Sequence, residues 1–227
     1  MPPATSPTDT EGIIAMTGPL DSNSSTPQEE NTSNLRPLLD RNRAFAAGGA
    51  HEGVAIMPRQ PVFLVTCLDP RVDPAAFLGV ELGDAPVIRN AGGRVTEEVI
   101  NDIAFISYLT ATMIPDGPLF EVAVIHHTGC GRGFLADAGF RSGFAARTGL
   151  DEAELAAEAV IDPAATVRTD VERLLSSPKV PPQVSVSGHV YDLQTGLVTT
   201  VVGPSRPGRA HRPPAEAPDA SPAPQPG

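Results

Sequence analysis

Cysteine is scarce in this sequence, whose 227 residues include two, Cys67 and Cys130. Two thiols cannot form a disulfide framework of the kind that holds small secreted domains together. A single structural disulfide between them is the weaker interpretation. We therefore expect the two cysteines to act as a pair of thiolate ligands.

Basic residues are also few, with 16 Lys and Arg against 27 Asp and Glu and a net charge of −11. The excess of acid is spread along the chain, and Lys and Arg form no cluster. Nucleic acids and anionic membranes are bound through concentrated positive charge. Neither is an expected partner.

Long apolar runs are missing, since no segment approaches the roughly 20 residues that span a bilayer. Residues 1–6 carry neither a basic segment nor an apolar one, so a secretory signal is not expected. We therefore expect a cytoplasmic protein, in a compartment where thiols stay reduced.

Three regions differ in composition. Residues 1–34 are rich in Ser, Thr, Pro, Asn and Glu, and residues 204–227 are dominated by Pro and Ala, so neither region can build a core. Both are predicted to be disordered tails. Residues 35–203 are predicted to form one domain with a sizeable core.

Within 35–203, short apolar runs alternate with helical patterns. Helices are predicted over 35–47, 96–113 and about 134–146, as a short element after Asp151, and from Pro163 to before Pro178. Strands are predicted over 62–66, 87–88, 122–125, 184–191 and 197–202. This order indicates an α/β fold, with a mostly parallel β-sheet flanked by helices and a C-terminal β-hairpin.

Potential metal ligands follow two of these strands. Cys67 follows one, and His127 and Cys130 follow another. Functional sites in open α/β sheets collect at the carboxyl ends of parallel strands, so we expect these side chains to meet. Two thiolates and one imidazole suit a tetrahedral Zn²⁺, and three protein ligands leave one position open for chemistry.

His126 competes with His127 for the role of histidine ligand. The spacing from His127 to Cys130 lets a tight turn direct both side chains at one ion, and Gly129 gives that turn its freedom. His126 lies one residue earlier on the strand and should face the opposite side. We predict that His127 is the ligand and that His126 is a packed or hydrogen-bonded neighbour.

Asp69 and Arg71 are the candidate catalytic residues. In an extended conformation, which Pro70 favours for the residue before it, Asp69 points to the same side as Cys67. Asp69 can be a fourth metal ligand, which closes the site, or it can accept a hydrogen bond from metal-bound water. Arg71 can hold Asp69 off the metal in a bidentate pair. A plain ion pair at the end of the strand is the alternative.

At these residues the sequence resembles the β-class carbonic anhydrases, whose two signatures are C-x-D-x-R and H-x-x-C. Here they read CLDPR (67–71) and HTGC (127–130), with VIRNAGG (87–93) between them and GHVYDLQTG (188–196) near the end. The resemblance covers residues 35–203. Both signatures in order, each after an apolar strand, make it specific.

The resemblance implies an α/β sheet, homodimers or higher assemblies, and Zn²⁺ held by Cys67, His127 and Cys130. It implies a carbonate dehydratase, a lyase that hydrates CO₂ reversibly to bicarbonate and a proton through zinc-bound hydroxide. Asp69 and Arg71 would control the fourth zinc position, which Asp69 occupies in some members. Hydrolysis of COS or CS₂ at the same site is one alternative, and a non-catalytic zinc or thiol protein is another.

Two residues depart from the family pattern. Pro70 stands where a small residue such as Ser or Ala is more frequent, and it should stiffen the loop. Arg132 stands where an apolar residue is frequent. Arg132 is predicted either to favour anions through its positive field or simply to face solvent.

Overall fold

The computed structural model describes residues 34–115 and 120–208, which fall in two compact units that divide after Ala50. The first unit contains α1 (Arg36–Ala47), which confirms the predicted helix and buries none of its side chains. Most of the two predicted tails lies outside the described residues. Across the described ranges, no helix has the length and apolar character needed to cross a membrane.

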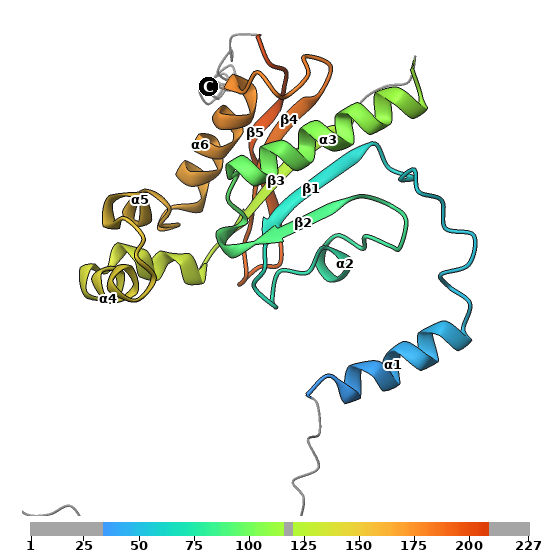
Figure 1. The fold of residues 1–227 in the computed structure, drawn as a ribbon, viewed down its shortest axis with the longest axis horizontal. Coiled ribbons are helices and arrows are strands. Elements are labelled where there is room, and N and C mark those ends of the chain that lie inside the picture. Colours follow the sequence, from blue (N-terminus) through green and yellow to red (C-terminus); the bar gives the residue numbers. More distant parts are fainter. Residues whose placement is uncertain (1–33, 116–119, 209–227) are drawn as a thin grey trace, which may run out of the picture. The chain divides into compact units, whose positions relative to one another are not determined.

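The second unit is organised around a five-stranded sheet in the order β2-β1-β3-β4-β5 (Figure 1). β1, β2, β3 and β4 run parallel, and β5 pairs with β4 in the antiparallel direction. The predicted α/β fold with a C-terminal hairpin is therefore confirmed. The strands are β1 (Val62–Cys67), β2 (Val87–Asn90), β3 (Glu121–His127), β4 (Ser185–Tyr191) and β5 (Val198–Ser205).

Helices cover the sheet unequally. α3 (Glu97–Met113) and α6 (Pro163–Ser176) pack on one face and bury the main core, in which Val65, Val124 and Ile103 are fully enclosed. The short α2 (Pro74–Phe77) packs Phe77 against the opposite face. α4 (Ala138–Thr148) and α5 (Glu152–Ala157) pack together with the 3₁₀ turn η2 (Gly131–Ala136).

Side-chain caps fix where several helices begin. Thr96 accepts a hydrogen bond from the Val99 amide at the start of α3, as predicted. Asp151 and Asp162 cap α5 and α6 in the same way. Asp137 caps α4, and this cap explains why the helix predicted over 134–146 is divided into η2 and α4.

Two strands are longer than predicted at the end that carries the ligands. Pairing with β2 continues to Cys67, and pairing of β3 with β4 continues to His127, which lies level with Tyr191. Neighbouring strands therefore hold the backbone of both residues. α2 was not predicted, although Asp73 before Pro74 is a cap followed by proline at the first helical position.

Candidate metal centre

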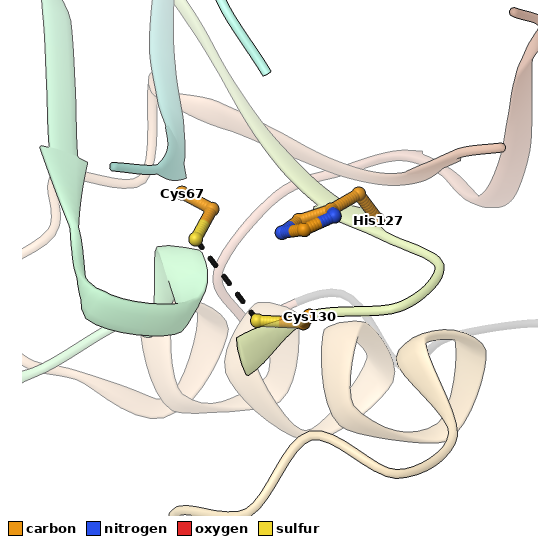
Figure 2. A group of neighbouring side chains, drawn as sticks. All are labelled: Cys67, His127 and Cys130. Carbon is orange, nitrogen blue, oxygen red and sulfur yellow. Dashed lines mark hydrogen bonds between the residues drawn. The ribbon is translucent and has the colours of Figure 1, made fainter. Parts of the chain in front are cut away.

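Cys67, His127 and Cys130 meet at the carboxyl edge of the sheet (Figure 2). Thr66 pairs with Ile125 in the parallel strands β1 and β3, so the two strands end close to each other at one edge of the sheet. One potential ligand atom of each of the three side chains lies within 4.8 Å of the others, and all three residues are buried. The two sulfur atoms are 4.0 Å apart.

The turn from His127 to Cys130 is anchored to the end of β4. The Thr128 amide donates to the Tyr191 carbonyl at 3.1 Å, and the Leu193 amide donates to the Thr128 hydroxyl at 3.0 Å. Gly129 has a φ of +64°, a left-handed conformation that a side chain would strain. The tight turn expected between the two ligands is therefore present.

One ring nitrogen of His127 is free to bind a metal. Nδ1 lies 2.9 Å from the Thr128 carbonyl oxygen. A carbonyl can only accept, so Nδ1 carries the proton and Nε2 presents a lone pair. Nε2 is buried without a hydrogen-bond partner among the described residues. Because His127 lies in one cluster with Cys67 and Cys130, a metal ion held there would supply the missing partner.

The two thiols lie within hydrogen-bonding distance of each other. The hydrogen bond from Cys130 lowers the pKa of Cys67, while the same contact and burial raise the pKa of Cys130. The backbone amide of Asp69 also donates to the Cys67 sulfur, at 3.4 Å. Amide donors of this kind stabilise thiolates.

This donor set fits Zn²⁺. With Zn–S bonds of about 2.3 Å, two sulfurs at tetrahedral angles lie roughly 3.8 Å apart, close to the separation here. A divalent ion would displace the thiol protons, because zinc binds cysteine as the thiolate. The lone pair of His127 supplies a third ligand of the type that zinc prefers.

His126 faces away from this cluster, toward α6. Its Nε2 lies 3.2 Å from the Gly93 carbonyl oxygen and 3.2 Å from Asp170 Oδ2. Arg94 donates to both carboxylate oxygens of Asp170, and all three side chains are buried. Burial raises the pKa of Asp170, but the hydrogen bonds from His126 and Arg94 outweigh it and lower this pKa.

Arg71 forms a hydrogen-bonded ion pair with the Asp69 carboxylate. Nε donates to Oδ1 at 2.9 Å and Nη2 to Oδ2 at 2.6 Å, which is the bidentate geometry expected from the sequence. These bonds hold the pKa of Asp69 well below its usual range. Arg71 Nη2 also donates to the Gly129 carbonyl at 3.1 Å, so the pair is fixed to the ligand turn.

Arg89 is a residue that sequence reasoning missed. Its Nε donates to the Cys67 carbonyl at 3.0 Å and its Nη2 to the Asp69 carbonyl at 2.7 Å. Arg89 thus fixes the backbone that carries one thiol and the carboxylate. Its position in the segment between the two signatures was the available signal.

A cavity of about 370 Å³ opens beside the cluster. Its walls are mostly apolar, and the lining includes Cys67, Cys130 and Asp69. Arg132 lies in the cavity wall. Its guanidinium forms hydrogen bonds to Glu158 and to the Ala91 carbonyl, so it does not simply face solvent. The lining residues are Cys67, Leu68, Asp69, Pro70, Ala91, Gly92, Cys130, Gly131, Arg132, Leu135, Phe140 and Phe144.

Comparisons with known proteins agree with this geometry. The family model described as carbonic anhydrase matches residues 62–147, which contain all of the clustered side chains. A crystal structure of a carbonic anhydrase from Streptococcus mutans has a TM-score of 0.64 and 32% identity, with 74% of this chain and 98% of that chain covered. A carbon disulfide hydrolase of Saccharolobus solfataricus is 27% identical over 59% of this chain and 74% of its own length.

β-Carbonic anhydrase 1 of Mycobacterium tuberculosis is 31% identical over 160 residues, which are 70% of this chain and 93% of that protein. The alignment therefore spans nearly the whole relative and more than two thirds of this chain. With both signatures meeting in one cluster, this chain belongs to the β-carbonic anhydrase family.

Proposed function

We propose that this protein is a carbonic anhydrase, a lyase that catalyses the zinc-dependent, reversible hydration of CO₂ to bicarbonate and a proton. The cluster of Cys67, His127 and Cys130 beside the Asp69–Arg71 pair supports the proposal most directly. The family supplies the reaction class, and the cluster supplies the donor set that the reaction requires.

Three side chains would hold the zinc ion, and a three-ligand set leaves a fourth position for chemistry. Zinc in such a site supplies Lewis acidity, which brings the pKa of coordinated water toward about 7. The protein supplies the two thiolates and the lone pair of His127. The Asp69 amide donates to the Cys67 sulfur, which favours the thiolate form.

Asp69 is proposed as the catalytic hydrogen-bond acceptor, with Arg71 fixing its position. Because its pKa is depressed, the carboxylate stays ionised at neutral pH and can only accept. In the described arrangement both carboxylate oxygens bind Arg71. Release of Arg71 would free Asp69 to become a fourth ligand, so the pair would decide whether the site is open.

The cavity suits a small uncharged substrate. Leu68, Pro70, Leu135, Phe140 and Phe144 supply apolar surface, which favours CO₂ over water. The polar groups on the side of the cluster can orient the attacking water. Bicarbonate, as an anion, gains little from apolar walls, which favours its departure.

A stopped-flow assay of CO₂ hydration with zinc-loaded protein, at mildly alkaline pH, tests this function. We expect catalysis well above the buffer rate and about one zinc per chain. A protein that holds one zinc per chain and shows no hydration above buffer would contradict the proposal.

Hydrolysis of COS or CS₂ is a second candidate, because a relative is a carbon disulfide hydrolase. Both compounds are linear and apolar like CO₂, and the same cavity and ligands would serve. The lower identity and coverage of that relative make this candidate the weaker one. Sulfide release without CO₂ hydration would favour it.

A non-catalytic zinc or thiol protein is the third candidate. The two cysteines are free, and their sulfurs lie 4.0 Å apart. If their role is redox sensing, mild peroxide should close a disulfide and expel the metal. Thiol titration with metal analysis before and after peroxide separates this role from catalysis.

A homodimer or higher assembly and a cytoplasmic location complete the proposal. Large apolar side chains beside the cavity are exposed, among them Leu68, Phe134 and Phe140. Exposed apolar surface of this kind favours association between copies. Cysteine thiols stay reduced in the cytosol, which favours a cytoplasmic location. Sedimentation of the zinc-loaded protein tests the assembly, and fractionation of the native cells tests the location.

A further inference from the structure

The side chain of Arg132 joins three segments around the metal centre. Its Nε donates to the Glu158 carbonyl at 3.1 Å, and its Nη2 donates to the Glu158 carboxylate at 3.3 Å. Its Nη1 donates to the Ala91 carbonyl at 3.3 Å. These bonds connect η2, which follows Cys130, to η1 (Ala91–Gly93) and to Glu158, the C-cap residue of α5.

The aliphatic part of Arg132 also packs against the backbone of η1. A Cβ placed on Gly92 would lie 2.7 Å from Arg132 Cδ, so only glycine permits this approach. η1 lies against the backbone of Cys67, since a Cβ placed on Gly93 would lie 3.0 Å from the Cys67 amide nitrogen, and η2 begins directly after Cys130. Arg132 therefore links η1, which contacts Cys67, to η2, which follows Cys130.

Glu158 holds the guanidinium of Arg132 in place. Its carboxylate also lies 3.5 Å from Arg94 Nη1 and 3.5 Å from Arg173 Nη1. Arg94 is enclosed and already paired with Asp170, so it is a fixed neighbour. A carboxylate among three arginines has little freedom to move, which restrains the arginine that reaches the cavity wall.

We propose that Arg132 is a positioning residue for zinc binding, which sets the distance between Cys67 and Cys130 with the help of Glu158. The proposal rests on the proposed zinc site. Residues around metal ligands orient them, and their loss typically weakens metal affinity by about 10- to 100-fold. Arg132 acts through η1 and η2 and does not touch the metal.

Zinc transfer to a chelator tests the role of Arg132. The variant Arg132→Met keeps the aliphatic stem and removes the guanidinium. Arg141→Met is the matched control, because Arg141 also donates to carbonyls of η2, at Leu135 (2.8 Å) and Ala136 (3.3 Å), but does not line the cavity. We expect zinc affinity to fall about 10-fold in Arg132→Met and to stay near wild type in the control.

Urea unfolding of the metal-free proteins separates positioning from general stability. We expect Arg132→Met and Arg141→Met to lose similar, small amounts of stability, although their zinc affinities differ. Arg132→Lys, which keeps the charge but not the fork of donors, should fall between Arg132→Met and wild type. If Arg132→Met does not fold, Glu158→Gln replaces it, with a loss of zinc affinity in the same direction.

Wild-type zinc affinity in Arg132→Met, or an equal loss in the Arg141 control, would overturn the proposal. So would wild-type affinity in Glu158→Gln if that variant is needed. Zinc content of the wild type is measured first. A wild type that binds zinc but does not hydrate CO₂ would refute the proposed function, whereas the comparison of zinc affinities would still decide the role of Arg132.

Discussion

Arg71 binds both carboxylate oxygens of Asp69, through Nε at 2.9 Å and Nη2 at 2.6 Å. The same guanidinium reaches the Gly129 carbonyl in the turn between His127 and Cys130. One arginine thus fixes the carboxylate relative to the ligands from the second strand. Under the proposed function, this pairing keeps Asp69 available to water and away from the metal.

Replacing Asp69 with Asn should separate metal binding from catalysis. Asp69→Asn should retain zinc, because Cys67, His127 and Cys130 remain, but it should lose at least about 100-fold in kcat/KM, since a carboxylate acceptor becomes a neutral amide. Metal analysis and stopped-flow hydration measure the two effects. Asp84→Asn, at an exposed ion pair with Arg59, is the control. A fully active Asp69→Asn would show that the assigned role is wrong.

Replacing Cys67 with Ser should remove zinc and activity together. A serine hydroxyl is a poor zinc ligand, and the remaining thiol and imidazole form an incomplete set. Zinc content after dialysis against a weak chelator, and CO₂ hydration by the same sample, are the two measurements. If Cys67→Ser kept one tightly bound zinc per chain, the ligand set proposed here would have to be abandoned.

The two adjacent histidines should behave differently. His127→Gln should lose zinc, because Nε2 of His127 carries the lone pair that would bind the metal together with the two cysteines. His126→Gln should keep zinc and lose stability, because His126 binds Asp170 and the Gly93 carbonyl in the interior. Metal analysis and urea unfolding of both variants provide the comparison. Equal zinc loss in the two variants would contradict the assignment of His127.

Asp170 should contribute strongly to stability. Asp170→Asn removes the carboxylate closest to the buried Arg94 and leaves it only the longer contact with Glu158, so we expect a loss of about 3 kcal/mol in the free energy of unfolding. Urea unfolding at pH 7 measures this loss. The pair of Asp84 and Arg59 provides the comparison, and because Arg59 is exposed to solvent, Asp84→Asn should cost much less.

The stabilisation by Asp170 should also depend on pH. The pKa of Asp170 is lowered in the folded state, so its contribution is fully present above the ordinary aspartate pKa of about 3.9. It is lost as the pH falls through the lowered value. The stability difference between wild type and Asp170→Asn should therefore be constant from pH 7 to about pH 5 and shrink below about pH 4. A difference that grows on acidification would exclude this explanation.

The sequence alone was enough to predict that Cys67, His127 and Cys130 cluster and that a mostly parallel sheet brings them together. Strands show period-two alternation, so adjacent His126 and His127 had to face opposite sides. Parallel strands carry their carboxyl ends to one edge, so Cys67 and His127 had to meet there. Asp69 and Arg71 are two residues apart, and local geometry was sufficient to predict their pairing.

Tertiary structure decided what surrounds these residues. Arg94 and Asp170 are 76 positions apart, and Arg132 and Glu158 are 26 apart, with no periodic pattern that relates either pair. Such contacts depend on how helices and loops pack, which is set by the shape of the whole core. The sequence therefore determined which atoms could bind a metal. Only the folded chain decided how Arg71, Arg89 and Arg132 hold the backbone and carboxylate around them.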